Sequence, residues 1–289
     1  MATDKRERQR SNRQARIEAE RKESTSENTK QRILLVGVVA VLLFGGLFLL
    51  SRAGGDDSGE AIDTPDLTLG TTTTTDSANA PSTTEPLVSA VSAPEPGGSI
   101  TGETTCPEED GSSERITSFE NAPPTCIDDT KTYTAEVTTN LGTIVFELDA
   151  TKAPAIVNNF VVLARYHYYD DAPFHRIIPG FVIQGGDAVG AQPGTGDPGY
   201  SVPDELPDEG EYEIGSVAMA NSGPDTNGSQ FFVITGEDGA ALPPLYSLFG
   251  TVIEGLDVVT AIESIPTSPG DAPSEPAIIE SVTITESGS

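Results

Sequence analysis

Three polar side chains lie inside the apolar pattern of FHRIIPGFVIQGGD, the stretch that runs from Phe174 to Asp187. His175 is a potential acid or base near neutral pH, Arg176 a permanently charged donor of several hydrogen bonds, and Gln184 an amide that donates and accepts. A Pro-Gly turn divides the stretch into two strands. In such a hairpin an arginine usually pairs with a surface carboxylate, so the stretch alone leaves open whether Arg176 takes part in a reaction.

The elements around this hairpin are mostly short strands. The runs at 132–138 and 142–148 alternate apolar and polar residues, which predicts a β-hairpin, and 277–285 predicts a last strand. A helix is predicted to begin near Thr151, where a capping residue and a proline precede an apolar face, and a second helix spans 256–265. Many short strands with two helices favour a closed β-barrel or a sandwich over a parallel α/β sheet.

The charge of the chain is divided unevenly. Residues 1–32 hold ten of the 16 Lys and Arg residues and carry a net charge of about +4, whereas the rest of the chain carries about −33. An acidic surface of this size repels polyanions, so we expect no nucleic-acid partner.

An uncharged run, ILLVGVVAVLLFGGLFLL, occupies positions 33–50. As a helix it would be roughly 27 Å long, which approaches the thickness of a hydrocarbon core. The positive-inside rule then places the basic segment in the cytoplasm and the acidic remainder outside. A cleaved signal peptide is the competing interpretation. The long basic lead and the lack of a small-x-small cleavage site favour an uncleaved, single-pass anchor in the cell membrane.

Residues 51–130 are rich in Thr, Ser, Pro and Gly, and we predict a disordered extracytoplasmic linker there, followed by one folded domain at 131–289. Outside a membrane Cys106 and Cys126 meet oxidising conditions, which favours a disulfide between them. Two free thiols are the alternative. Two cysteines and two histidines are too few to predict a metal site.

Two blocks of this sequence resemble the signatures of one family, the cyclophilins. FHRIIPGFVIQGGD resembles the family's signature hairpin, and SVAMANSGPDTNGSQFFVIT at 216–235 resembles its second signature. The Gly/Pro-rich run at 194–206 is similar to a loop that borders the family's groove, and the order and spacing fit across 131–286. The resemblance implies an eight-stranded antiparallel closed barrel capped by two helices.

The resemblance also implies a reaction, peptidyl-prolyl cis-trans isomerisation of X-Pro bonds in polypeptides. Rotation about such a bond meets a barrier of roughly 18–20 kcal/mol, because the amide nitrogen shares its lone pair with the carbonyl. No covalent bond breaks, so we expect no cofactor and no metal. The catalyst instead requires an apolar slot for the proline ring and donors that favour a localised lone pair in the transition state.

Individual residues acquire roles from the same resemblance. Arg176 corresponds to the family's catalytic arginine, which donates to the prolyl nitrogen as amide resonance is lost. The family's substrate-binding positions correspond to Phe181, Val182, Gln184, Ala220, Asn221, Phe232, Leu242 and Tyr246. Without the resemblance the phenylalanines would be ordinary core and the two amides would be bonded within turns. His175 becomes a structural, hydrogen-bonded histidine, because strand alternation points it to the other face and isomerisation requires no proton transfer.

Three departures from the family pattern concern the pocket. The chain has no tryptophan, Tyr246 stands where the family has histidine, and Val182 stands where it often has methionine. Because the family's tryptophan favours tight cyclosporin binding, we expect weak cyclosporin binding here.

The sequence therefore predicts a membrane-tethered isomerase that accelerates folding of exported or cell-surface proteins. The alternative is a non-catalytic module or chaperone that holds proline-containing segments at the membrane.

Overall fold

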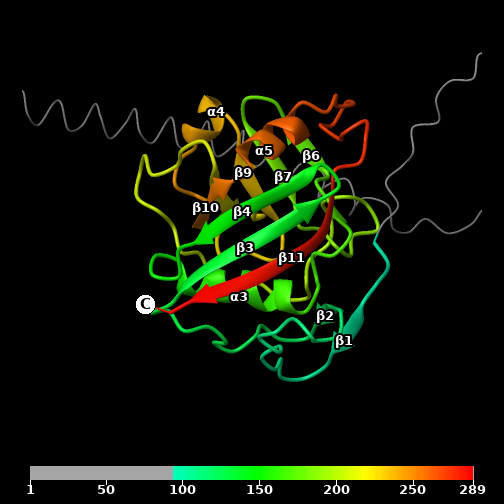
Figure 1. Cartoon of the computed structure of the whole chain (residues 1–289), viewed down its shortest axis with the longest axis vertical. Coiled ribbons are helices and arrows are strands. Elements are labelled where there is room, and N and C mark those ends of the chain that lie inside the picture. The colour runs from blue at the N-terminus through cyan, green and yellow to red at the C-terminus, as the bar shows by residue number, and fades with distance from the viewer. Residues whose placement is uncertain (1–93, 289) are drawn as a thin grey trace, which may run out of the picture.

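The computed structural model describes residues 94–288, and most of them surround one curled antiparallel sheet (Figure 1). Its strands, in the order in which they pair, are β5 (Ala172–Pro173), β11 (Ile278–Ser287), β3 (Thr132–Thr139), β4 (Gly142–Leu148), β10 (Leu248–Glu254), β8 (Ser216–Met219), β9 (Phe231–Ile234), β7 (Val182–Gly185) and β6 (Arg176–Ile178). Every neighbouring pair is antiparallel. The expectation of a mainly β fold, and not a parallel α/β sheet, is confirmed.

The two end strands of this sheet, β5 and β6, are consecutive in the chain. Only Phe174 and His175 separate them, and the Phe174 N–H donates to the Ala277 carbonyl at 2.8 Å. One stretch thus runs from one end of the sheet to the other, which bends the sheet round on itself. The prediction of eight strands in a closed barrel is corrected to nine strands in a curled sheet, because this stretch divides into two short strands.

The predicted hairpin at 132–148 is confirmed as β3 and β4. Their register runs from Tyr133 opposite Leu148 to Thr139 opposite Gly142. Alternate residues of β3 are buried, which is the pattern of a strand with one face on a core.

Helices cover the two open sides of the sheet. In Figure 1, α3 (Pro154–Arg165) lies below it, and α4 (Glu237–Ala240) and α5 (Leu256–Glu263) lie above it. The two predicted helices are confirmed as α3 and α5, whereas the short α4 was not predicted. Thr151 does not cap α3; its N–H donates to Asp149 Oδ1 at 3.2 Å instead. The core centres on Phe160 of α3, whose ring lies 5.7 Å from that of Phe231.

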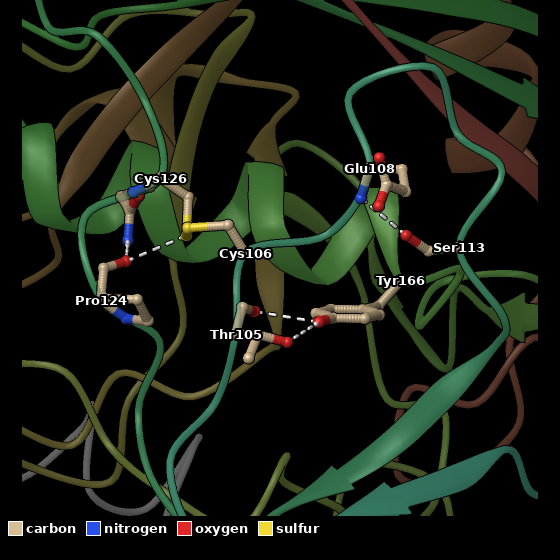
Figure 2. Close-up of a disulfide and its surroundings, with 8 residues drawn as sticks. Thr105, Cys106, Glu108, Ser113, Pro124, Cys126 and Tyr166 are labelled. Atoms are coloured by element: carbon tan, nitrogen blue, oxygen red, sulfur yellow. Dashed lines mark hydrogen bonds between the residues drawn. A yellow bond between two sulfur atoms is a disulfide. The ribbon is translucent and has the colours of Figure 1, made fainter.

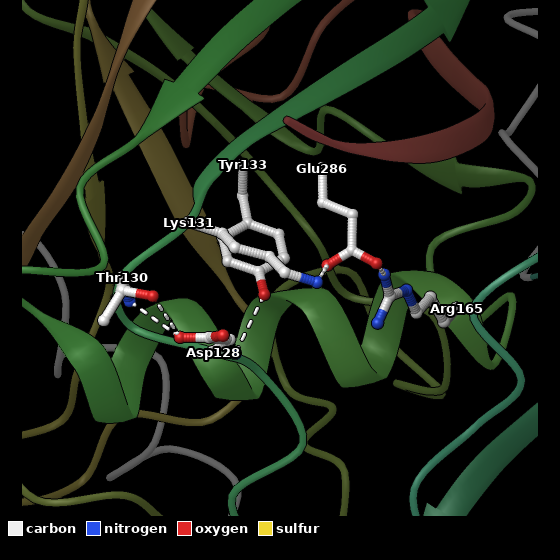
Figure 3. Close-up of polar contacts among 6 residues, drawn as sticks. All are labelled: Asp128, Thr130, Lys131, Tyr133, Arg165 and Glu286. Atoms are coloured by element: carbon white, nitrogen blue, oxygen red, sulfur yellow. Dashed lines mark hydrogen bonds and ion pairs between the residues drawn. The ribbon is translucent and has the colours of Figure 1, made fainter. Parts of the chain in front are cut away.

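Contacts around Glu286 join the first strand of the domain to the last strand and to α3 (Figure 3). The Glu286 carboxylate lies 3.3 Å from Lys131 Nζ and 3.7 Å from Arg165 Nη2. Nearby, the Tyr133 hydroxyl accepts the N–H of Asp128 at 2.9 Å. The residues just before β3 are therefore held on the domain by these contacts.

Residues 94–130 form an extension that packs on the domain, which corrects the prediction of a disordered linker up to residue 130. The extension contains β1 (Gly98–Ile100) and β2 (Ile116–Phe119), paired in parallel. A disulfide joins Cys106 to Cys126 beside α3 (Figure 2). The ordered part of the chain begins well before Lys131. The extension has few apolar side chains, but backbone hydrogen bonds and one disulfide hold it on the domain.

The predicted basic segment at 1–32, membrane anchor at 33–50 and linker over 51–93 lie outside the described residues and stay predictions. Within 94–288, no helix has the length and apolar character that crossing a membrane requires.

Candidate active site

Arg176 lies opposite Gln184 in the hairpin that β6 and β7 form. Its side chain is only 12% exposed and is held at two nitrogens. Nη1 donates to Gln184 Oε1 at 3.3 Å, and Nε lies 3.4 Å from Asp271 Oδ2. Burial lowers the pKa of Arg176 and the Asp271 carboxylate opposes that shift. Two partners thus fix the plane of a desolvated guanidinium.

A row of side-chain amides continues from this guanidinium across the sheet. Gln184 Nε2 donates to Gln230 Oε1 at 3.1 Å. Gln230 Nε2 in turn donates to the carbonyls of Gly194 and Gly196, at 3.1 and 2.9 Å. These hydrogen bonds link Arg176 to the loop that the sequence predicts beside a groove. Gln184 therefore holds Arg176 in place as well as lining the groove.

A second apolar cluster, separate from the main core, lies beside the row. Its members are Val182, Tyr212, Ala218, Ala220, Phe232, Ile234 and Tyr246, with Phe181, Ala240, Leu242 and Leu248 packed against them. The rings of Phe232 and Tyr246 meet edge to face, with centroids 5.3 Å apart. Every apolar residue that the sequence assigns to substrate binding belongs to this cluster. We call the cluster the apolar pocket, because the sequence assigns residues of this cluster to the binding of the proline ring.

Neighbouring residues on one strand separate the two clusters. Phe231 belongs to the main core, whereas Phe232 belongs to the apolar pocket. This division follows from the alternation of side chains along a strand. One face of the sheet therefore packs against the main core, and the other face carries the apolar pocket.

Tyr246 stands where the family has a histidine. Its backbone is held by Tyr212, a residue that the sequence did not single out. The Tyr212 hydroxyl donates to the Tyr246 carbonyl at 2.6 Å and accepts the Tyr246 N–H at 3.1 Å. Burial raises the pKa of Tyr246 to about 12, an effect that the charge of Arg176 reduces. A neutral phenol therefore lies within the electrostatic reach of the guanidinium at pH 7.

Asn221 connects two loops at the rim of the pocket. Its Nδ2 donates to the Leu245 carbonyl at 3.0 Å, and its Oδ1 accepts the Gly223 N–H at 3.2 Å. Substrate bonding by Asn221 stays a prediction.

A groove of about 670 Å³ is lined by Gln184, Ala220 and Asn221, of which Ala220 also belongs to the apolar pocket. Its opposite wall includes Gly196, Gly199 and other residues of the loop at 194–201. Part of the predicted loop, within 194–201, therefore lines a groove, and its identity as the substrate groove stays a prediction. Gln184 lines this groove and bonds to Arg176, so the guanidinium lies beside the groove.

Comparison with known proteins leads to one family. The family profile described as cyclophilin type peptidyl-prolyl cis-trans isomerase/CLD matches residues 134–284, more than half of the chain. The chain belongs to the cyclophilin family. It is accordingly a peptidyl-prolyl cis-trans isomerase.

Several known cyclophilins are similar to it. The peptidyl-prolyl cis-trans isomerase A of Mycobacterium tuberculosis is 43% identical over 171 residues, covering 53% of this chain and 92% of that protein. CYP18-1 of Arabidopsis thaliana is 44% identical over 148 residues, covering 50% and 92%. A crystal structure of a Cryptosporidium parvum cyclophilin is 33% identical, with a TM-score of 0.49, and covers 53% of this chain and 98% of that chain.

His175 is a buried neutral residue of this cyclophilin and not a chemical participant. Burial, helped by the charge of Arg176, lowers its pKa to about 4 despite the nearby Asp187 carboxylate. The Nδ1 atom of His175 has no hydrogen-bond partner among the described residues, although the backbone of Pro173 acts to raise the pKa of this histidine. Its Nε2 lies beside Gly194, where an added Cβ would approach it to 3.1 Å.

The stability of this cyclophilin should therefore decrease in mild acid. Between pH 6.5 and about 4 the unfolded chain protonates His175 while the folded chain does not, so the free energy of unfolding falls by roughly 3 kcal/mol. Urea unfolding of wild type and His175→Gln across this range tests it, with His167→Gln as the matched control. In the His167→Gln control the free energy of unfolding should still fall in acid as it does in wild type, because His175 is present. An equal decrease in wild type and His175→Gln would contradict the assignment.

Asp271 is a second functional residue that the sequence did not reveal. It holds the catalytic strand twice, since its carboxylate contacts Arg176 and its carbonyl accepts the Ile177 N–H at 2.8 Å. It lies in the loop before β11 with a left-handed φ of 64°, a conformation that asparagine tolerates. Nothing in its local sequence distinguishes it from other turn aspartates.

Replacing Asp271 by asparagine should lower kcat/KM about two- to fivefold, because a partly exposed ion pair contributes at most ~1 kcal/mol to holding the guanidinium. NMR exchange spectroscopy on an X-Pro peptide measures the change. Asp257→Asn, an exposed aspartate on α5, is the control and should leave the rate unchanged. If the Asp271→Asn variant had wild-type activity, Asp271 would have no role in positioning Arg176.

Proposed function

We propose that this cyclophilin isomerises X-Pro bonds in exported or cell-surface polypeptides, tethered to the cell membrane by residues 33–50. One observation supports the reaction most directly, the guanidinium of Arg176 held between Asp271 and Gln184 beside an apolar pocket. The uncharged run and the basic lead before it support the tether. The Cys106–Cys126 disulfide supports an oxidising compartment.

The proposed mechanism follows from the two states of a prolyl amide. In the planar ground state the nitrogen lone pair is delocalised, whereas in the twisted transition state it becomes a hydrogen-bond acceptor. The proline ring enters the pocket floored by Phe232, and Arg176 donates to the nitrogen only after resonance is lost. Interactions stronger in the transition state than in the ground state accelerate the step.

The backbone on either side of the proline occupies the groove. Gln184 and the main chain of Asn221 supply donors and acceptors there, so the substrate is an extended segment and not a free amino acid. Tyr246 closes the pocket with a neutral ring in place of the family's histidine. Its hydroxyl offers one donor, which the proposed mechanism does not require for proton transfer.

Two measurements on the full chain test this proposal. A proline-limited refolding assay should show faster folding of an X-Pro client with the protein present, and no acceleration would sink the enzymatic part. Membrane fractionation of intact cells should find the chain with the membrane and its domain open to external protease. A Leu42→Arg, Leu43→Arg variant is the control and should lose the membrane association. Equal distribution of both chains would reject the tether while leaving the isomerase intact.

Cyclosporin binding should be weak in this cyclophilin. No tryptophan exists in the chain, so the indole that favours the drug in other cyclophilins is missing. Titration calorimetry should give a dissociation constant well above the nanomolar range, and a nanomolar value would contradict this expectation.

A further inference from the structure

The extension at 94–130 lies entirely before the residues that match the family, yet it contacts the wall of the substrate groove. The contact is made by Phe119 at the end of β2. Its N–H donates to the Pro198 carbonyl at 2.8 Å. Its ring lies edge to face with the ring of Tyr200, with centroids 6.0 Å apart. Both partners belong to the loop that includes groove residues.

This contact is close enough to restrict the loop. A Cβ placed on Gly199 would lie 2.2 Å from the Phe119 carbonyl oxygen, so the two backbones touch directly. Gly199 and Tyr200 both line the groove. Phe119 itself is 2% exposed, so its ring is fully packed behind the groove wall and does not reach the substrate.

The other side of the extension is fastened to α3. The Cys126 N–H donates to Asn158 Oδ1 at 2.7 Å, and Asn158 Nδ2 donates to the Pro124 carbonyl at 2.9 Å. The Tyr166 hydroxyl at the end of α3 donates to the Thr105 carbonyl at 2.9 Å (Figure 2). The Cys106–Cys126 disulfide joins these two anchored segments, as Figure 2 shows.

The same helix also holds the groove loop by its next residue. Asn159 Oδ1 accepts the Tyr200 hydroxyl at 2.7 Å. Two consecutive residues of α3 thus fix both segments relative to the helix: Asn158 bonds to the extension and Asn159 bonds to the groove loop. The ring of Phe119, which lies 5.6 Å from that of Tyr166, fills the space between them.

We infer that Phe119 is a positioning residue for substrate binding, and that the disulfide-fastened extension braces the groove loop at 198–200 from behind. The brace lowers the cost of ordering the loop around a substrate chain, so it acts on affinity. It does not touch the guanidinium or the pocket, so it leaves the rate of the bound substrate unchanged. A residue that served stability alone would change the fraction of folded protein and not KM.

The test measures KM and kcat separately for an X-Pro peptide with residues on both sides of the proline, by NMR exchange at increasing peptide concentration. Phe119→Ala should raise KM about threefold or more with kcat within twofold of wild type, as expected for lost preorganisation. Phe119→Leu should restore most of the affinity. The matched control is Ile116→Ala, because Ile116 lies on the same strand and packs on the same core.

An unchanged KM in Phe119→Ala, or an equal rise in Ile116→Ala, would overturn the inference while wild-type turnover continued to support the isomerase. If Phe119→Ala fails to fold, wild type is compared before and after reduction with dithiothreitol, which converts the disulfide to two thiols and is itself oxidised to a cyclic disulfide. A higher KM in the reduced protein at unchanged kcat supports the brace, and equal KM values in the two states reject it.

Discussion

Replacing Arg176 by alanine is expected to lower kcat/KM for an X-Pro peptide by about 10²- to 10³-fold, the loss typical of removing one donor that stabilises transition-state charge. The guanidinium is desolvated and held by Asp271 and Gln184, so the proposed donation to the prolyl nitrogen would act in a low-dielectric site. Most of the loss should appear in kcat, because the bond forms only in the twisted state.

The control for this variant is Arg165→Ala. Arg165 is also a buried arginine near a carboxylate, 3.7 Å from Glu286, but it lies on α3 away from the pocket. Its loss should lower stability and leave kcat/KM per folded molecule near the wild-type value. If Arg176→Ala kept wild-type kcat/KM, the proposed catalytic role of Arg176 would fail.

Removing the disulfide should have the largest effect on stability. The Cys106→Ser, Cys126→Ser double variant is expected to lose ~3 kcal/mol of unfolding free energy, because the link closes a loop of about twenty residues in the unfolded chain. The loss also frees the extension whose Phe119 is buried against the domain. Urea unfolding with linear extrapolation measures it.

Dithiothreitol supplies the internal control for this prediction. Reduced wild type should unfold at the midpoint of the double variant, and the double variant itself should not respond to the reagent. A midpoint that is the same in oxidised and reduced wild type would show that the non-covalent contacts of the extension suffice.

The central hairpin was predictable because its information is local. Alternation, a Pro-Gly turn and two signature blocks indicate where Arg176, Gln184 and Phe232 lie, and the structure brings these residues together. The curl of the sheet was also indicated, but not the division of the stretch at 172–178 into two strands. That division depends on the pairing of β5 with β11, which is about 100 residues away in the sequence, whereas β6 pairs with the neighbouring β7.

Partners brought in from distant loops were not predictable. Asp271 reaches Arg176 across 95 positions, and Tyr212 reaches Tyr246 across 34. Each lies in an irregular segment before a strand, where the local composition does not indicate a distant partner. The extension was missed for a related reason, since its order rests on backbone hydrogen bonds and a disulfide, while composition reports mainly how much apolar surface a segment can bury.

The adjacent residues Phe231 and Phe232 face opposite ways, one into the core and the other into the apolar pocket. The sheet thus separates the residues that pack the core from the residues that we propose bind the substrate. Residues such as Val182, Ala220 and Leu242 lie on the substrate side, so their volumes can vary with little disturbance of the packing around Phe160. Such a division lets evolution, or a protein engineer, retune which prolyl segments are accepted while the scaffold stays constant.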